Sequence, residues 1–128
     1  MKKLIIAVDY DDTIVDQDFP NSGTLKKNAI KYLNLWKQQG HSVILFTCRN
    51  GTPLTTALNY MKNNNFIPHE VNQNTQEQID DYNTRHPNIP ISSKVYANVY
   101  IDDRGINGLP KSWNKINKMI QEISENGK

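Results

Sequence analysis

An uninterrupted apolar run near the start of the chain, Leu4 to Val8, ends directly at an acidic segment that begins with Asp9. A run of four to eight aliphatic residues without polar alternation is typical of a strand buried on both faces, as in parallel sheets. Ligands of open α/β sheets bind just beyond the carboxyl ends of such strands. The segment Asp9-Tyr10-Asp11-Asp12-Thr13 therefore lies where a site is expected, although an acidic turn that caps the next helix explains this motif alone about equally well.

Two further apolar strands end in the same way. The strand predicted at Ser42–Phe46 ends at Thr47, and the one predicted at Ala97–Ile101 runs into Asp102 and Asp103. Three buried strands would deliver these groups and Asp9 to one edge of a sheet, where crowded carboxylates repel one another unless a cation joins them. Mg²⁺ is held by one or two carboxylates, water and phosphate oxygens. Because three strands end in such polar residues, a site that binds metal and phosphate is favoured over an acidic turn that only caps a helix.

The rest of the chain alternates helices and strands, as an α/β fold requires. Periodic apolar residues, capping residues and stop signals predict the other elements. These are a helix over 24–39 that stops at Gly40, a helix capped by Thr52 with Pro53 at its first position, a weak strand at 69–71, a short helix over 75–82, an irregular loop over 85–93 and a helix capped by Ser112. The predicted fold is a Rossmann-like three-layer sandwich with a parallel central sheet.

Composition excludes several classes of protein. A chain of 128 residues suits one domain spanning 1–128, and a net charge of +2 without a basic cluster argues against nucleic-acid binding. The single cysteine excludes an internal disulfide and fits a reducing cytoplasm. Only five apolar residues precede Asp9, which is too short for a signal peptide or a membrane helix.

The motifs and their order resemble those of the haloacid dehalogenase (HAD) superfamily of phosphohydrolases, and in particular a subfamily of small bacterial and phage-type members. The family's four motifs are a strand followed by D-x-D-x-[TV], a strand ending in Ser or Thr, a lone Lys, and a strand ending in an acidic pair. The matching residues are Asp9, Asp11 and Thr13, then Thr47, then Lys94, and then Asp102 and Asp103. One departure is Asp12, which stands where the family usually has Gly; Asp tolerates unusual backbone angles better than most residues.

The resemblance implies a Mg²⁺-dependent phosphomonoester hydrolase with an aspartyl-phosphate intermediate. By it, Asp9 is the nucleophile, Asp11 is the general acid and base, and Thr47 and Lys94 contact the phosphoryl oxygens. Asp9, Asp102 and the backbone carbonyl of Asp11 would hold Mg²⁺, with Asp103 more distant. Thr13 and Arg49 are the candidate substrate-binding residues.

Short loops predict a capless enzyme with an open site. A flap of residues 14–23 and an insert of residues 73–93 are too small for a folded cap domain. We therefore expect a phosphorylated small molecule as substrate, a nucleotide or a sugar phosphate, and no membrane partner; the sequence leaves oligomerisation open. A catalytically silent binding module remains an alternative. A phospho-accepting receiver domain is disfavoured because no strand in mid-chain ends in Asp.

Four other reactive residues are expected to have structural roles only. Cys48 is predicted to be a small buried packing residue. The three histidines lie at element ends without metal-binding spacing and are predicted to occupy surfaces or turns, namely His41, His69 and His86.

Overall fold

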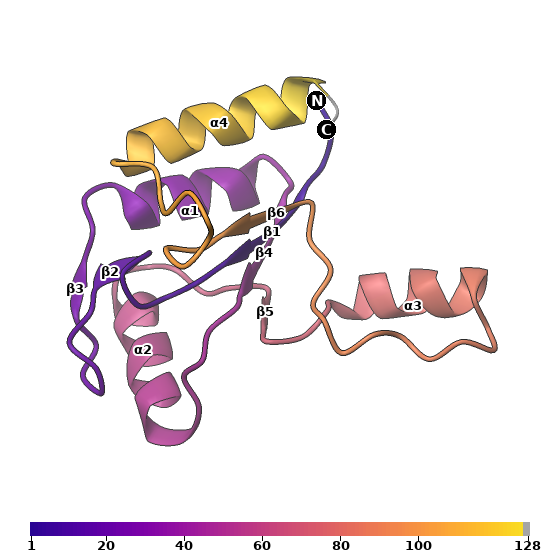
Figure 1. Cartoon of the computed structure of the whole chain (residues 1–128), viewed down its shortest axis with the longest axis horizontal. Coiled ribbons are helices and arrows are strands. Elements are labelled where there is room, and N and C mark those ends of the chain that lie inside the picture. The colour runs from indigo at the N-terminus through magenta and orange to yellow at the C-terminus, as the bar shows by residue number, and fades with distance from the viewer. Residues whose placement is uncertain (127–128) are drawn as a thin grey trace.

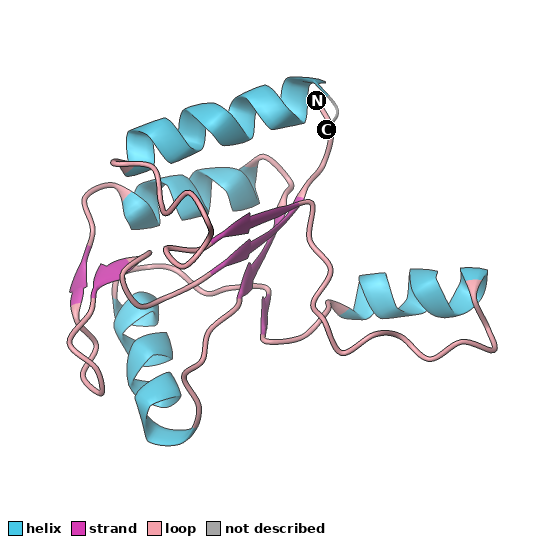
Figure 2. Cartoon of the chain, viewed as in Figure 1, coloured by secondary structure: helices cyan, strands magenta, loops and turns pink. Residues whose placement is uncertain are grey.

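The structure is a computed structural model, and it describes residues 1–126 (Figures 1 and 2). The elements follow in the order β1 (Ile5–Val8), β2 (Val15–Asp16), β3 (Thr24–Leu25), α1 (Ala29–Gln38), β4 (Ser42–Leu45), α2 (Gly51–Asn63), β5 (Glu70–Val71), α3 (Gln76–Arg85), β6 (Val99–Ile101) and α4 (Trp113–Asn126). None of the helices within 1–126 is long and apolar enough to cross a membrane.

A four-stranded sheet with the order β5-β4-β1-β6 forms the centre of the molecule, and all its strand pairs are parallel. The register pairs Val8 with Leu45 on one side and with Ile101 on the other. The carboxyl ends of β4, β1 and β6 therefore lie next to one another. The predicted α/β fold with a parallel central sheet and no full cap domain is confirmed.

The main core lies on one face of this sheet. Alternate strand residues such as Ile6, Val8 and Val43 point into it, because successive side chains of a strand face opposite sides. The helices α1, α2 and α4 contribute the opposing buried residues, which include Leu33, Trp36, Met61, Ile116 and Ile120. This packing fixes the strands whose ends carry the acidic segments.

The other face of the sheet is covered mainly by the connection between α3 and β6. Val95 and Ala97 of this connection are buried, and so are Ala7 and Ile44 on the sheet. The helix α3 projects away from the rest of the chain (Figure 1) and contains no buried residue. Residues 73–93, predicted to be an insert, thus form most of a projecting arm.

Two predicted helix starts are wrong. The helix expected from residue 24 begins at Ala29, because Leu25 pairs with Val15 in the hairpin β2–β3, and Asn28 has a left-handed backbone with φ 67°. The helix expected to be capped by Thr52 begins at Gly51, where the Asn50 side chain accepts the Gly51 N–H. Proline is tolerated within this first turn because its missing N–H has no partner there.

The other two helix starts agree with the sequence. Thr75 and Gln78 form the predicted capping box, in which each side chain accepts a backbone N–H of the other residue. The Ser112 hydroxyl accepts the N–H of Lys115 at the start of α4. The first of these helices extends to Arg85, one turn further than predicted.

Candidate metal centre

Three carboxylates meet at the carboxyl edge of the sheet. Asp9 follows β1, and Asp102 and Asp103 follow the adjacent strand β6. One oxygen from each of the three residues lies within 4.8 Å of the others. Oxygen ligands converging in this way suit a hard divalent cation, so this group could bind a metal ion.

Thr13 ties the three carboxylates to the core. Its side chain is fully buried, and its Oγ1 lies 3.4 Å from both Asp9 Oδ2 and Asp103 Oδ1. The same hydroxyl accepts the backbone N–H of Asp103 at 3.2 Å. The Trp113 indole donates a buried hydrogen bond of 3.0 Å to the Thr13 carbonyl, so the first turn of α4 fixes the acidic loop. No motif in the sequence indicates this contact, since 100 residues separate the partners.

The crowding of charge is visible in the acidity of Asp9. Partial burial raises the pKa of Asp9 to about 7, and a hydrogen bond with the Asp103 carboxyl and the charges of Asp102 and Asp103 act in the same direction. A backbone hydrogen bond at Tyr10 opposes the rise in pKa. A bound cation would favour the ionised carboxylate, because an opposite charge lowers a carboxyl pKa.

The backbone of the acidic loop explains the residue at position 12. Asp12 has φ 58°, in the left-handed region that favours Gly and, among other residues, Asn and Asp. Its side chain is exposed and accepts the Gln17 N–H at 3.0 Å. Asp therefore replaces the usual Gly here without leaving the required backbone conformation.

Asp11 does not join the carboxylate group, because Arg49 holds its side chain. Arg49 Nε and Nη2 donate to the two Asp11 oxygens at 2.9 and 2.8 Å. The remaining N–H groups of the guanidinium donate to backbone carbonyls of Pro20, Asn21 and Pro53. The charge of Asp11 stabilises the guanidinium, and the pKa of Arg49 is raised, chiefly by their hydrogen bond.

This arrangement occupies all five N–H donors of a guanidinium. The Arg49 side chain is 1% exposed and lies between the rings of Tyr10 and Phe19, at 4.8 and 5.2 Å from their centroids. A contact between Arg49 and a substrate stays a prediction, and it requires one of these bonds to open. Sequence reasoning missed the pair with Asp11, since 38 residues separate the partners.

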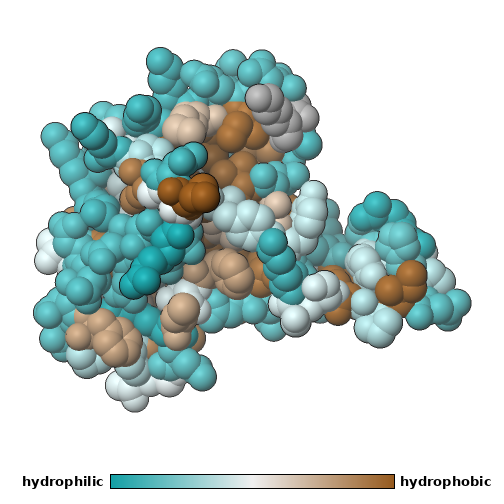
Figure 3. Space-filling view, viewed as in Figure 1, coloured by the Kyte–Doolittle hydropathy of each residue, from teal (hydrophilic) through white to brown (hydrophobic). Residues whose placement is uncertain are grey.

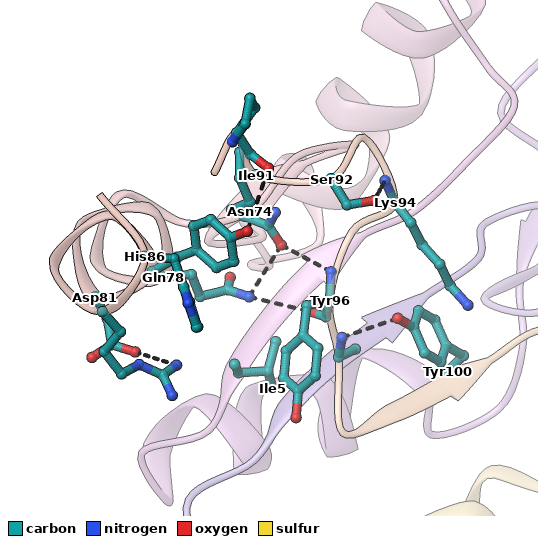
Figure 4. A pocket seen from close by; sticks show the side chains of 14 residues that line it. Ile5, Asn74, Gln78, Asp81, His86, Ile91, Ser92, Lys94, Tyr96 and Tyr100 are labelled. Atoms are coloured by element: carbon teal, nitrogen blue, oxygen red, sulfur yellow. Dashed lines mark hydrogen bonds and ion pairs between the residues drawn. The ribbon is translucent and has the colours of Figure 1, made fainter. Parts of the chain in front are cut away.

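Thr47 and Lys94 have partners other than the carboxylates. The Thr47 hydroxyl accepts the Arg49 N–H at 3.1 Å, and its own N–H donates to Asn72 at 2.8 Å. The Lys94 side chain is exposed and extends over Tyr100 (Figure 4), with Nζ 5.3 Å from the ring centroid. The catalytic roles of both residues stay predictions.

The expectation for Cys48 is wrong, and the one for His41, a surface or turn position, holds for the turn alone. Cys48 is exposed, because the chain turns outward after β4 and Arg49 points inward in its place. His41 is 1% exposed, and its Nδ1 accepts the N–H of Leu4 at 2.9 Å, which joins the turn after α1 to the start of β1. His69 and His86 are exposed, as predicted.

The protein has an α/β fold, and its candidate site is the carboxylate cluster beyond the carboxyl ends of the adjacent parallel strands β1 and β6. The sequence matches no protein-family model and no curated protein. It is similar to a solved structure of a conserved protein from Bacteroides thetaiotaomicron, with 30% identity and a TM-score of 0.80 over 94% of this chain and 92% of the other. The chain belongs to the same family as this conserved protein.

Proposed function

We propose that the protein is a Mg²⁺-dependent phosphomonoester hydrolase of the HAD type. The observation that carries the proposal is the convergence of Asp9, Asp102 and Asp103 at the carboxyl edge of the parallel sheet. The order of the motifs along the chain supports the same reaction, because an acidic first motif, a Thr, a Lys and a final acidic pair follow one another in the sequence.

The donor atoms suit Mg²⁺, which prefers carboxylate, carbonyl and water oxygens. In this proposal Asp9 and Asp102 hold the ion together with the backbone carbonyl of Asp11, and Asp103 contributes through water. The ion supplies positive charge that offsets the repulsion among the carboxylates and the charge of the phosphoryl group.

Asp9 acts as the nucleophile in the proposed reaction. One of its carboxylate oxygens forms a bond to phosphorus while the bond from phosphorus to the leaving oxygen breaks, and the leaving oxygen takes a proton from Asp11. Water then gives its proton to Asp11 and attacks the phosphorus, which breaks the bond to Asp9. Thr47 donates its hydroxyl hydrogen to a phosphoryl oxygen, and Lys94 neutralises charge there.

Two side chains must move before this reaction can proceed. Both oxygens of Asp11 accept hydrogen bonds from Arg49, so the side chain must give up at least one of them to turn toward the leaving oxygen. Lys94 must swing from the Tyr100 ring toward the phosphoryl group. Binding of an anionic substrate favours the second movement through charge attraction.

Hydrolysis of p-nitrophenyl phosphate with and without Mg²⁺ tests this function. We expect turnover that requires the metal, and Asp9→Asn should reduce turnover to background because the amide cannot attack phosphorus. Asp12→Asn is the matched control, because this exposed neighbour undergoes the same chemical change and Asn suits its left-handed backbone.

The control should retain activity near that of the wild type. If Asp9→Asn kept more than a few per cent of the wild-type rate, the covalent mechanism would be wrong. A folded wild-type protein that is inactive with Mg²⁺ on a panel of phosphomonoesters would instead indicate a silent binding module.

A further inference from the structure

The molecule exposes more surface than a compact monomer of its mass. Its accessible area is 7,917 Å² for a chain of 14.7 kDa. Compact monomers of this mass expose about 6,900 Å², so the excess is about 1,000 Å². The α3 arm, residues 73–93, projects from the rest of the chain (Figure 1), and we attribute the excess area to it.

The helix within the arm has little tertiary support. The ten residues of α3 include none that is buried, and its ion pair between Arg85 and Asp81 is exposed on both sides. Isolated helices of this length are marginal in water, since packing of an apolar face supplies most of the stability of a protein helix. The capping box at Thr75 contributes only about 1 kcal/mol. Among the described residues 1–126, α3 is contacted only at its edge, for example by the Tyr96 carbonyl that accepts a hydrogen bond from Gln78, and no segment buries one of its faces.

A groove of about 840 Å³ lies between α3 and the sheet face beside it. Tyr82 lines it from the arm, Ile5 and Tyr100 from the sheet, and Tyr96 from the connection between them (Figure 4). Tyr96 and Tyr100 are 58% and 42% exposed. Hydrophobic side chains are also visible at the base of the arm and on the arm itself (Figure 3). Parallel sheets are normally covered on both faces, and the groove marks a part of the face opposite the main core that the chain leaves uncovered.

We propose that a second copy of the chain fills this groove, with the arm of each protomer packed against the groove of the other in a two-fold dimer. The excess area of about 1,000 Å² per chain is close to the roughly 800 Å² that each partner buries in a stable interface. Tyrosine and arginine, which face the groove, are enriched at interfaces. A two-fold arrangement gives both arms the same contacts.

The proposal concerns assembly and does not depend on the proposed phosphatase activity.

The molar mass in solution tests the dimer, measured by light scattering or sedimentation from about 1 to about 100 µM, a range that covers weak interfaces of this area. We expect twice 14.7 kDa for the wild type and a shift to the single-chain mass for Tyr96→Asp, which places a charge in the interface. Ile106→Asp is the control, because Ile106 is fully exposed and does not line the groove. A monomeric wild type, or a Tyr96→Asp variant that stays dimeric, overturns the proposal.

Amide hydrogen exchange provides a second readout that needs no substitution. In the dimer, the amides of α3 are protected, and dilution removes this protection while the amides of β1 and β4 stay protected. If the α3 amides exchange at unprotected rates at every concentration, the arm has no partner and the proposal fails. This measurement decides the question even if Tyr96→Asp does not fold.

Discussion

Replacing Arg49 by Ala should destabilise the protein far more than removing any surface cation. The substitution leaves the Asp11 carboxylate without its partner and removes donors from the carbonyls of Pro20, Asn21 and Pro53. Breaking one partner of a buried ion pair costs about 3–5 kcal/mol. Because the Asp11 side chain is 29% exposed, water can solvate it in part when Arg49 is removed. We therefore expect the free energy of unfolding to fall by about 2–4 kcal/mol.

Urea unfolding followed by tryptophan fluorescence measures this loss, since Trp36 and Trp113 are both buried. With a slope of about 2 kcal/mol per molar urea, the midpoint should fall by about 1–2 M. The control is Lys26→Ala, which breaks a more exposed pair with Asp16 and should cost less than about 1 kcal/mol. If Arg49→Ala and Lys26→Ala have the same midpoint, Arg49 does not hold the flap and the acidic loop together.

Two further effects follow from the carboxylates and from the buried histidine. Millimolar Mg²⁺ should raise the melting temperature through binding to the native state. Asp102→Asn should abolish this rise, whereas Asp18→Asn, a change at an exposed position, should not. Identical wild-type melts in Mg²⁺ and in chelator would contradict a metal site. Burial, with a smaller effect of the Lys3 charge, lowers the pKa of His41 below 6.5, so the unfolded state binds the proton more readily. Stability should therefore be intact above about pH 6.5 and fall below it by up to about 1.4 kcal/mol per pH unit. The dependence should weaken in His41→Gln and persist in His86→Gln, and equal pH profiles for the wild type and His41→Gln would refute the role of His41.

The strands and the acidic edge were predictable because they depend on local sequence. The run before Asp9 is wholly apolar and the run before Asp102 is rich in residues that favour strands, and adjacent parallel strands bring their carboxyl ends together. The same reasoning failed at Leu25, whose spacing suits a helix but whose partner is Val15 in a hairpin. A periodic pattern does not reveal which residue pairs across a turn.

The environment of single polar side chains was not predictable, since it depends on contacts between distant segments. Arg49 and Cys48 are neighbours in an outward turn, and the arginine points inward because Asp11 and the carbonyls of Pro20, Asn21 and Pro53 accept its hydrogen bonds. His41 is buried because its Nδ1 accepts an N–H from a strand 37 residues earlier. Neither contact has a spacing that a sequence pattern could show.

The position of Lys94 divides the candidate site into two parts of different rigidity. The carboxylates follow strands whose side chains pack in the core, whereas Lys94 is an exposed residue of the irregular connection between α3 and β6. Segments with few buried contacts open at low free energy, and core strands open only near global unfolding. Changes within residues 73–98 can thus alter how often the lysine reaches the site while the carboxylates keep their geometry. Under the proposed function, turnover can therefore evolve through this connection without any change in metal affinity.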